Sequence, residues 1–319
     1  MTSERRRIGI VAVHKTLPRA DLRGQCAPAS RLGGPSGGGS AMTQIRHILL
    51  ASDLTERSRC ALIRSVQLKR ATAAGLTVLH VADPGLTTEL AEDRRAASVA
   101  TMEAQLSEVS AGKLRRVLIR VAVGVPVAAI IAEAETRDAD LVVLGEPGKQ
   151  RTKELFAGTT AERVIRQSRR PVLVAKLPSG ELYRRIVVAF DRSEAAQRAL
   201  ATAIALAPRA EFHLVYASQD PEAGRGEEET AGPHVLLANA AEQVTRRSAY
   251  PRARLAIAVS NGAPVHTVTS AVAAFDADLV AMGTHGRGRL QAALFGSVAQ
   301  QLLAVSPCDV LATRPQWRE

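Results

Sequence analysis

The sequence predicts two tandem α/β domains, each built on a parallel β-sheet. One observation behind this prediction is an internal repeat, in which residues of the same kind recur 138 positions apart. A second is that short β-branched runs alternate with longer segments of helical periodicity, which is typical of βα units around a parallel sheet. A third is the length of 319 residues, which suits two domains of about 100–200 residues each.

The repeat keeps its register across residue types that have nothing else in common. The pairs that share the 138-residue offset are Asp53/Asp191, Gly124/Gly262, Pro126/Pro264, Asp138/Asp276, Gly145/Gly283 and Gly158/Gly296. The second strand region departs from this offset by two residues, since Val78–Val81 best matches Leu214–Ala217. Small gaps of this kind are tolerated in surface loops. We therefore predict a first domain at residues 42–178 and a second at residues 183–314.

Each domain is expected to begin with a strand and to continue with alternating helices and strands. In the first domain the strands are predicted at Ile48–Ala51, Thr77–Val81, Val117–Val123, Leu141–Leu144 and Val172–Ala175. A helix is predicted over Ser58–Ala74, where apolar residues recur at helical spacing. We expect Thr55 or Ser58 to cap this helix, and Ser193 to cap its counterpart in the second domain.

Two glycine-rich loops follow strand ends and lead into helices, one in each half. The earlier loop reads Gly145-x-x-Gly148-x9-Gly158-Thr159, and the later one reads Gly283-x-x-Gly286-x9-Gly296-Ser297. Glycine lets backbone N–H groups approach a ligand, and a helix N-terminus favours an anion. One such loop alone could merely need glycine for a turn with positive φ, but two loops with matching spacing favour a phosphate site. Ligands of parallel sheets bind beyond the carboxyl ends of the strands, where Asp53 and Asp191 are also expected.

Residues 1–41 belong to neither repeat. They contain Arg5–Arg7 and the glycine-rich stretch Gly33–Gly39, a composition that buries little apolar surface, so we expect a disordered leader. Met42 lies just before the first strand and is an alternative start of the natural chain; the sequence leaves both starts open. The leader holds seven Arg or Lys residues against two acids, so it carries +5 of the formal net charge of +11, and the two domains are mildly basic.

Composition excludes several kinds of partner. Aromatic residues make up 3% of the chain, too few for the stacking that nucleic-acid binding commonly uses. No apolar stretch approaches the ~20 residues of a membrane helix. Cys26, Cys60 and Cys308 lack a Cys-x-x-Cys spacing, which favours a reducing cytoplasm, and the histidines show no metal-ligand spacing. We therefore expect a cytoplasmic protein with no metal site.

Motifs of several enzyme classes are missing from the sequence. There is no Gly-x4-Gly-Lys-Ser/Thr phosphate loop, and no Gly-x-Gly-x-x-Gly follows the first strand. Gly34–Gly38 matches the hydrolase nucleophile pattern by letter, but it lies in low-complexity sequence. His285 is the one candidate base beside the later loop, and it is better suited to donate to a phosphate. No catalytic residue is assigned, and at most very slow turnover is expected.

With these motifs the chain resembles tandem members of the universal stress protein (UspA-like) family. The resemblance covers about residues 42–314, and its most specific motif is the Gly-x-x-Gly-x9-Gly-Ser/Thr pattern of both halves. It implies two domains, each with a five-stranded parallel sheet of strand order 3-2-1-4-5. It also implies pairing through the last strand and an internal pseudo-dimer, with a homodimer of whole chains left open. Many members with this motif bind ATP, whereas a second branch lacks the motif and does not.

The resemblance places the stronger nucleotide site in the second half. It implies that Asp191 contacts the ribose side of the ligand, with Ala189 just before it, and that the backbone of Ala217 faces adenine. The residues implied for the sugar side, the phosphate loop and the helix N-terminus are Met282, Gly283, His285, Gly286, Arg287, Gly288, Gly296, Ser297, Val298 and Ala299. Backbone donors, a hydroxyl and arginines suit a polyanion such as ATP, with Mg as an optional counter-ion.

The first half keeps part of the same set. The matching residues are Asp53, Val81, Gly145, Gly148, Gly158, Thr159 and Thr160. This half departs from the pattern at Glu146 and Pro147, because a carboxylate repels a phosphate and proline removes a backbone donor. We expect this site to bind ATP weakly, to bind something else or to be vestigial.

These patterns favour a regulatory module of the stress response. In this hypothesis ATP or a related adenine nucleotide binds, and its occupancy changes the surface presented to an unknown protein partner. Two alternatives stay open. One is a slow ATPase, or a nucleotidyl or phosphoryl transferase, that uses His285 and Arg287 on the phosphates. The other is a protein-interaction scaffold that binds no nucleotide.

Overall fold

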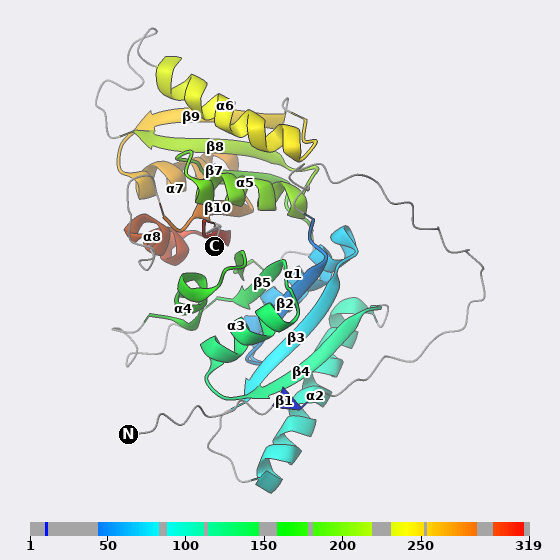
Figure 1. The fold of residues 1–319 in the computed structure, drawn as a ribbon. Coiled ribbons are helices and arrows are strands. Elements are labelled where there is room, and N and C mark those ends of the chain that lie inside the picture. The colour runs from blue at the N-terminus through cyan, green and yellow to red at the C-terminus, as the bar shows by residue number, and fades with distance from the viewer. Residues whose placement is uncertain are drawn as a thin grey trace, which may run out of the picture.

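The chain forms two α/β halves that meet in the middle of the molecule (Figure 1). The computed structural model describes residues 10–11, 44–82, 88–111, 114–146, 158–177, 181–218, 231–251, 254–285 and 296–315. The elements of the first half are β1 (Ile10–Val11), β2 (His47–Ala51), α1 (Glu56–Thr72), β3 (Gly75–Ala82), α2 (Thr88–Ser110), β4 (Val117–Val123), α3 (Pro126–Thr136), β5 (Leu141–Gly145), α4 (Thr160–Gln167) and β6 (Val172–Ala175). Those of the second half are β7 (Arg185–Ala189), α5 (Glu194–Leu206), β8 (Glu211–Ser218), α6 (Ala231–Arg247), β9 (Leu255–Asn261), α7 (Pro264–Phe275), β10 (Leu279–Gly283), α8 (Ser297–Val305) and β11 (Asp309–Thr313).

The strands join into one sheet with the order β1-β4-β3-β2-β5-β6-β11-β10-β7-β8-β9. Within each half the five longer strands are parallel, and their order is 3-2-1-4-5 when they are counted along that half. The predicted fold class and strand order are therefore confirmed. The last strands β6 and β11 pair antiparallel, with Leu173 opposite Leu311, so the halves form a pseudo-dimer within one continuous sheet.

A short strand precedes the first domain. Within the segment predicted to be a disordered leader, Ile10–Val11 form β1, which pairs antiparallel with β4 opposite Val121 and Ala122. The rest of that segment lies outside the described residues, and so does the candidate start Met42 that follows it. The disorder of the leader therefore stays a prediction there.

The first helices of the two halves begin differently. Ser193 caps α5 as predicted, because its Oγ accepts a hydrogen bond of 3.1 Å from the N–H of Ala196. Thr55 occupies the cap position of α1, but its hydroxyl donates to Asp53 Oδ1 at 2.7 Å and does not cap the helix. Ser58 lies in the first turn and donates its hydroxyl to the carbonyl of Thr55. Thr55 is therefore at the predicted cap position, but no side-chain hydrogen bond caps α1.

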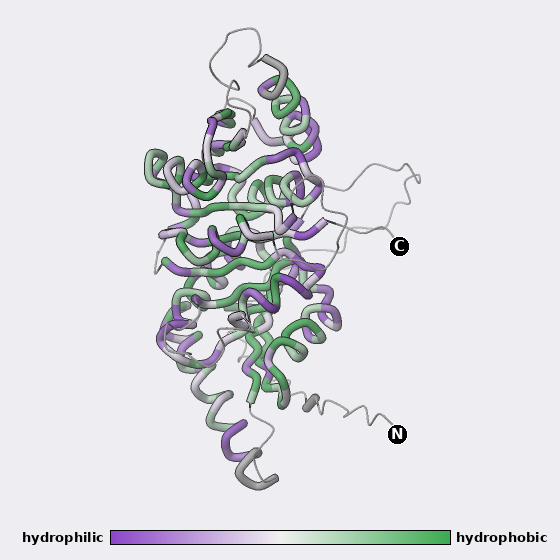
Figure 2. The backbone as a smooth tube through the Cα atoms, turned by 90° about the vertical axis from the view of Figure 1, so that its left-hand side faces the viewer, coloured by the Kyte–Doolittle hydropathy of each residue, from purple (hydrophilic) through white to green (hydrophobic). Residues whose placement is uncertain are grey.

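Helices cover both faces of the sheet, and two apolar clusters fill the space between the layers. Helices α1, α2, α5 and α6 pack on one face, and α3, α4, α7 and α8 pack on the other. The helical members of these clusters include Leu62, Leu106, Leu200 and Leu237 on the first face and Ile130, Val164, Val268 and Leu302 on the second. Strands covered on both faces are expected to be continuously apolar. Figure 2 shows this as green strands running through the middle of the molecule.

A buried ion pair crosses the seam between the halves. Arg64 in α1 donates its Nε to Asp309 Oδ2 at 2.9 Å, at the start of β11, and both side chains are at most 1% exposed. The Tyr183 hydroxyl donates to the same oxygen at 2.7 Å, and the Arg64 guanidinium lies 4.1 Å from the centre of the Tyr183 ring. Asp309 Oδ1 accepts the backbone N–H groups of Lys176 and Leu177. One carboxylate thus ties together α1, β11 and the connection between β6 and β7.

Burial raises the pKa of two tyrosines. The pKa of Tyr183 lies well above its ordinary value because the side chain is buried, and the neighbouring Asp309 carboxylate raises it further. Burial also raises the pKa of Tyr250 to about 12, and the Tyr250 hydroxyl donates to the carbonyl of Ala210. In the unfolded chain, both phenols are expected to have a pKa of about 10. Since the folded values are higher, the stability from these phenols is fully present below pH ~10 and is lost as the pH rises through the folded values.

We therefore expect the free energy of unfolding to fall between about pH 10 and 12. Urea denaturation at a series of pH values measures this fall. The double variant Tyr183→Phe, Tyr250→Phe is expected to show a shallower dependence on pH, because phenylalanine has no proton to lose. Equal slopes for the two proteins would contradict the raised pKa values.

Candidate functional site

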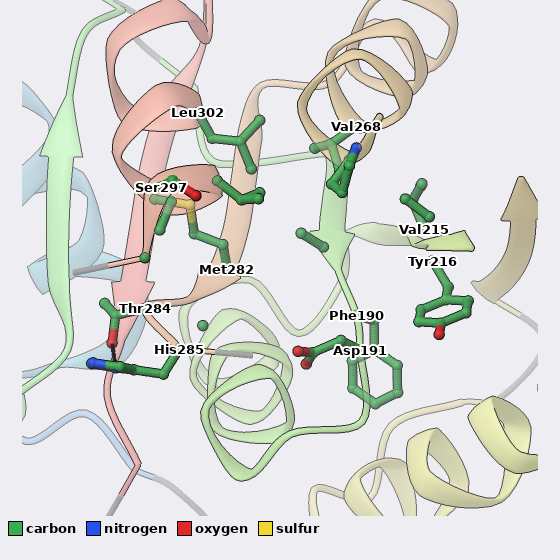
Figure 3. Close-up of a pocket in the computed structure, with 17 residues that line it drawn as sticks. Phe190, Asp191, Val215, Tyr216, Val268, Met282, Thr284, His285, Ser297 and Leu302 are labelled. Carbon is green, nitrogen blue, oxygen red and sulfur yellow. Dashed lines mark hydrogen bonds between the residues drawn. The ribbon is translucent and has the colours of Figure 1, made fainter. Parts of the chain in front are cut away.

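A cavity of about 270 Å³ opens at the carboxyl ends of the strands of the second half. Neighbouring strands β7 and β10 both border it, at the point where the order of the sheet reverses and α/β proteins commonly bind ligands. The lining residues are Ala189, Phe190, Asp191, Val215, Tyr216, Ala217, Pro264, Val268, Met282, Gly283, Thr284, His285, Gly296, Ser297, Val298, Ala299 and Leu302 (Figure 3). These residues come from β7, β8, β10, α7 and α8 and from the turns that follow the strands.

One part of the lining is apolar. Val215 comes from β8, Val268 from α7, Met282 from β10 and Leu302 from α8, and each is at most 3% exposed. Figure 3 shows Val268 and Leu302 on the two helices above the strand ends, with Met282 below them. The helices and the sheet therefore enclose an apolar slot, which suits a flat ring.

Asp191 supplies a carboxylate at the opposite rim of the cavity. It follows β7, and its Oδ1 accepts a hydrogen bond of 3.0 Å from the N–H of Ser193. Ser193 in turn caps α5, so the turn that carries Asp191 is fixed at both ends. Figure 3 shows the carboxylate directed away from Phe190, toward the side of the cavity formed by Met282 and His285. A carboxylate held in this way can accept hydrogen bonds from hydroxyl groups of a ligand.

The N-terminus of α8 forms the polar end of the cavity. The first N–H groups of a helix have no partner within the helix. In α8 the first intrahelical bond is donated by the N–H of Gln300 to the carbonyl of Gly296, at 2.9 Å. Ser297, Val298 and Ala299 precede Gln300 and line the cavity. Their N–H groups and the helix dipole favour an anion at this point.

The two ends of the glycine-rich loop are held together beside this helix. The N–H of Gly296 donates to the carbonyl of Thr284 at 3.0 Å, and the N–H of Thr284 donates to the carbonyl of Thr313 at 2.8 Å. The Thr284 hydroxyl lies 2.8 Å from His285 Nδ1 (Figure 3). These bonds link the end of β10, the end of β11 and the start of α8, so His285 is placed at the polar end of the cavity.

The glycines of the two loops serve different physical needs. A Cβ on Gly283 would lie 2.8 Å from Ala195 Cβ and 2.9 Å from the backbone nitrogen of Ala196, so the absence of a side chain lets α5 pack on the end of β10. Gly158 has a φ of +72°, a conformation that favours glycine. Gly296 has an ordinary φ of −62°, but its Cβ would lie 3.0 Å from the carbonyl of Thr284. Close packing therefore requires glycine at position 283, and a positive φ favours glycine at position 158.

The structure gathers the predicted residues of the second half around this one cavity. Those that line it are Ala189, Asp191, Ala217, Met282, Gly283, His285, Gly296, Ser297, Val298 and Ala299. The predicted Gly286, Arg287 and Gly288 lie outside the described residues. Seven further lining residues were not predicted from the sequence, namely Phe190, Val215, Tyr216, Pro264, Val268, Thr284 and Leu302. Of these, the strand-end residues could have been found as neighbours of predicted ones, whereas Val268 and Leu302 depend on how the helices pack.

The predicted residues of the first half lie at the carboxyl edge of their own strands or at the start of α4. Asp53 follows β2, Val81 lies in β3, Gly145 ends β5, Gly158 and Thr159 precede α4, and Thr160 begins it; Gly148 is outside the described residues. Burial raises the pKa of Asp53, but hydrogen bonds from Thr55 and Ser58 offset this effect, so its pKa is lower than usual. Ligand binding by these residues stays a prediction.

The described part of the chain holds neither a candidate metal site nor a helix that could cross a membrane. No group of three or more His, Cys, Asp or Glu side chains that could hold a metal ion occurs there. None of its helices combines the length and the apolar character that a bilayer crossing requires.

Comparisons with solved structures agree with this architecture. A universal stress protein from Archaeoglobus fulgidus DSM 4304 superposes with a TM-score of 0.66, at 22% identity, over 85% of this chain and 98% of the other. A putative universal stress protein from Pseudomonas aeruginosa UCBPP-PA14 superposes with a TM-score of 0.60, at 20% identity, over 86% and 95% of the two chains. At these identities the likeness shows the fold.

Sequence comparisons add the family. Universal stress protein MJ0531 of Methanocaldococcus jannaschii is 45% identical over 58 residues, which are 18% of this chain and 34% of the relative. The match therefore spans about a third of the relative's length. A sequence model of the Universal stress protein family matches residues 44–176 and again residues 182–314. With both halves matched in tandem, the chain belongs to the universal stress protein family.

Proposed function

We propose that the second half binds an adenine nucleotide, with ATP as the expected ligand, and that the chain is a nucleotide-dependent regulatory module of the stress response. The observation that carries this proposal is that a single cavity joins an apolar slot, a carboxylate and a helix N-terminus. These features suit the base, the sugar and the phosphates of a nucleotide, in that order.

The apolar slot is suited to the base. Adenine is flat, and the side chains of Val215, Val268 and Leu302 offer apolar surface from a strand and two helices. Ala217 lines the cavity near the end of β8, where a small side chain leaves room beside the backbone. The base would therefore exchange water for apolar contacts, which is the usual source of affinity in such pockets.

The polar groups are suited to the sugar and the phosphates. The Asp191 carboxylate can accept hydrogen bonds from ribose hydroxyls, and it is the one carboxylate among the described lining residues. The N–H groups at the start of α8, the Ser297 hydroxyl and His285 offer donors to the phosphates. A Mg ion bound with the nucleotide would be held mainly by the phosphates themselves, because the described lining offers a single acidic side chain for it.

The position of the cavity supports a regulatory role. Thr284 lines the cavity, its N–H bonds to Thr313 in β11, and the next residue, Arg314, donates to the carbonyl of Arg166 in the first half at 2.6 Å. Three contacts therefore connect a ligand in the cavity to the first half: the ligand with Thr284, Thr284 with β11, and Arg314 with Arg166. Ligand binding shifts an equilibrium between two conformations only by the difference in the ligand's affinity for them. The contacts between the two halves are one part of the structure that could differ between two such conformations.

The variant Ser297→Asp tests the site. We expect it to weaken ATP binding by about tenfold or more, because a carboxylate at the start of α8 repels the phosphates. The same aspartate favours the helix dipole, so the fold is expected to keep its stability. Isothermal titration with ATP measures the affinity, and thermal unfolding measures the stability.

Gln301→Glu is the matched control. Gln301 is exposed on the same helix and does not line the cavity, so the Gln301→Glu substitution adds the same negative charge at a point away from the ligand. The affinity of the Gln301→Glu variant for ATP is expected to stay within about twofold of that of the unchanged protein. Unchanged binding in both Ser297→Asp and a bulky Gly296→Trp variant would show that the nucleotide site lies elsewhere.

A further inference from the structure

A basic residue follows the last strand of each half. Lys176 comes directly after β6 and Arg314 directly after β11, and the two are 138 residues apart, which is the offset of the repeat. Because β6 and β11 pair antiparallel, the residue that leaves one strand lies beside the start of the other. The start of β11 follows α8, and the start of β6 follows α4. Each basic side chain is therefore placed near the end of a helix in the opposite half.

Lys176 caps the end of α8. The last four carbonyl groups of a helix have no partner within the helix. Lys176 Nζ donates to two carbonyls at this end, that of Leu303 at 2.7 Å and that of Ser306 at 2.9 Å, and its side chain is 6% exposed. The backbone N–H of Lys176 donates to Asp309 Oδ1 at 2.7 Å, so the residue is fixed at both its backbone and its ammonium group. A cation at a helix C-terminus is also favoured by the helix dipole.

Arg314 makes the reciprocal contact. Its guanidinium donates to the carbonyl of Arg166, in the last turn of α4, at 2.6 Å. Arg198 in α5 donates to the carbonyls of Arg314 and Arg169, both at 3.0 Å, and so holds the backbone of Arg314 beside the end of α4. Figure 1 shows α4 and α8 on either side of the seam between the halves. Each of these two helices is therefore held at its C-terminus by the opposite half.

Helix α8 connects Lys176 to the cavity. The first residues of α8 line the polar end of the cavity, and Leu302 lines its apolar slot. Leu302 directly precedes Leu303, whose carbonyl accepts the bond from Lys176. The helix has nine residues, and its backbone hydrogen bonds join each turn to the next, so it moves as one body. The contact with Lys176 therefore bears on where α8 presents its N–H groups and Leu302.

The same lysine faces the glycine-rich loop of the first half. Glu146 directly follows Gly145, the last residue of β5, and its carboxylate lies 4.0 Å from Lys176 Nζ. Burial lowers the pKa of Lys176, and the negative charge of Glu146 opposes this effect, so Glu146 helps to keep the ammonium charged. The Glu146 side chain is about half exposed, which leaves it open to an occupant of its loop. One ammonium group thus lies between that loop and the end of α8.

We infer that Lys176 is a positioning residue for the nucleotide site of the second half, and that through Lys176 the Glu146 loop of the first half sets how tightly that site binds. A held α8 keeps its N–H groups in the arrangement that suits the ligand. A released α8 spends part of its time in other positions, and the apparent affinity falls with the fraction of chains that are competent to bind. This inference rests on the proposed nucleotide site of the second half.

Three variants of the full chain test the cap, each by isothermal titration with ATP and by thermal unfolding. Lys176→Met keeps the apolar stem but leaves two carbonyls without their donor, so we expect ATP binding to weaken about threefold or more. Lys176→Arg supplies a cation of the kind that Arg314 provides in the repeat, and it is expected to regain most of that affinity. Tyr183→Phe is the matched control. It removes a hydrogen bond to Asp309 in the same seam but no contact of α8, so its affinity is expected to change by less than about twofold.

A charge reversal tests the dependence on the first half. Glu146→Lys places a second cation beside Lys176, which disfavours the charged cap, so we expect ATP binding in the second half to weaken about threefold or more. Glu92→Lys is its control. Glu92 is exposed on α2, which covers the opposite face of the sheet from α8, and the same change of charge there is expected to alter the affinity by less than about twofold.

Each outcome bears on a different statement. Full ATP affinity in Lys176→Met, or equal losses of affinity in Lys176→Met and Tyr183→Phe, would overturn the positioning role. An affinity of Lys176→Arg as low as that of Lys176→Met would overturn the cap by a cation. Unchanged affinity in Glu146→Lys, with a loss in Lys176→Met, would overturn only the dependence on the first half. An unchanged protein that binds no ATP would overturn the proposed function itself.

Discussion

Replacing Asp309 with asparagine is expected to lower the free energy of unfolding by about 3–5 kcal/mol. The carboxylate is fully buried and accepts four hydrogen bonds, two from Arg64 and Tyr183 and two from the backbone of Lys176 and Leu177. Asparagine replaces one acceptor oxygen with an N–H donor, so one pair of these donors loses its partner. The guanidinium of Arg64 then stays buried without its counter-charge. Urea denaturation at neutral pH measures the loss.

Asp138→Asn is the matched control for this prediction. Asp138 also pairs with an arginine, Arg170, at 2.7 Å, but its side chain is 71% exposed. Exposed pairs contribute at most about 1 kcal/mol, because water screens the charges. Asparagine also suits the positive φ of 48° at this position, so the backbone is not strained. Equal losses in the two variants would show that burial adds nothing to the pair of Asp309 and Arg64.

Gly283→Val is expected to lower the free energy of unfolding by about 1–3 kcal/mol and to weaken nucleotide binding at the same time. The new Cβ would lie within 3 Å of Ala195 Cβ and of the backbone nitrogen of Ala196, so α5 must move away from the end of β10. The start of α5 also fixes the turn of Asp191, so the carboxylate would move with it. Thermal unfolding and ATP titration of the same preparation measure both effects.

Gly75→Val is the control for Gly283→Val. Gly75 begins β3, and its nearest neighbour for an added Cβ is the ring of His47, at 2.9 Å. A side-chain ring can turn away, whereas the backbone of α5 cannot, so a smaller loss of stability is expected. A Gly283→Val protein that keeps its full stability and loses only ATP binding would show that this glycine serves the ligand alone.

The repeat allowed the fold to be predicted from the sequence. Strands buried on both faces are continuously apolar, as at Ile48–Leu50, and such runs are recognised by composition alone. Once the strands are placed, residues that follow them must share one edge of the sheet. This is why Asp191 and Gly283 could be assigned to one site although 92 residues separate them.

The same repeat could not reveal what differs between the halves. Arg64 and Asp309 are 245 residues apart, and their counterparts in the repeat are Thr202 and Pro171, which cannot form an ion pair. The apolar wall of the cavity was missed for a related reason, since Val268 enters it through the packing of α7, which no local pattern encodes. Contacts between elements depend on the whole fold, so they become visible only in the structure.

The antiparallel pairing of β6 with β11 bears on how this chain can assemble. A last strand standing alone would expose unpaired N–H and C=O groups, and such an edge is a template for joining other molecules. Here the two edges satisfy each other within one polypeptide, so their association is a first-order event that does not depend on protein concentration. Dilution therefore cannot part the halves, and a signal passing through this seam must travel as a change of shape rather than as a change in the number of subunits.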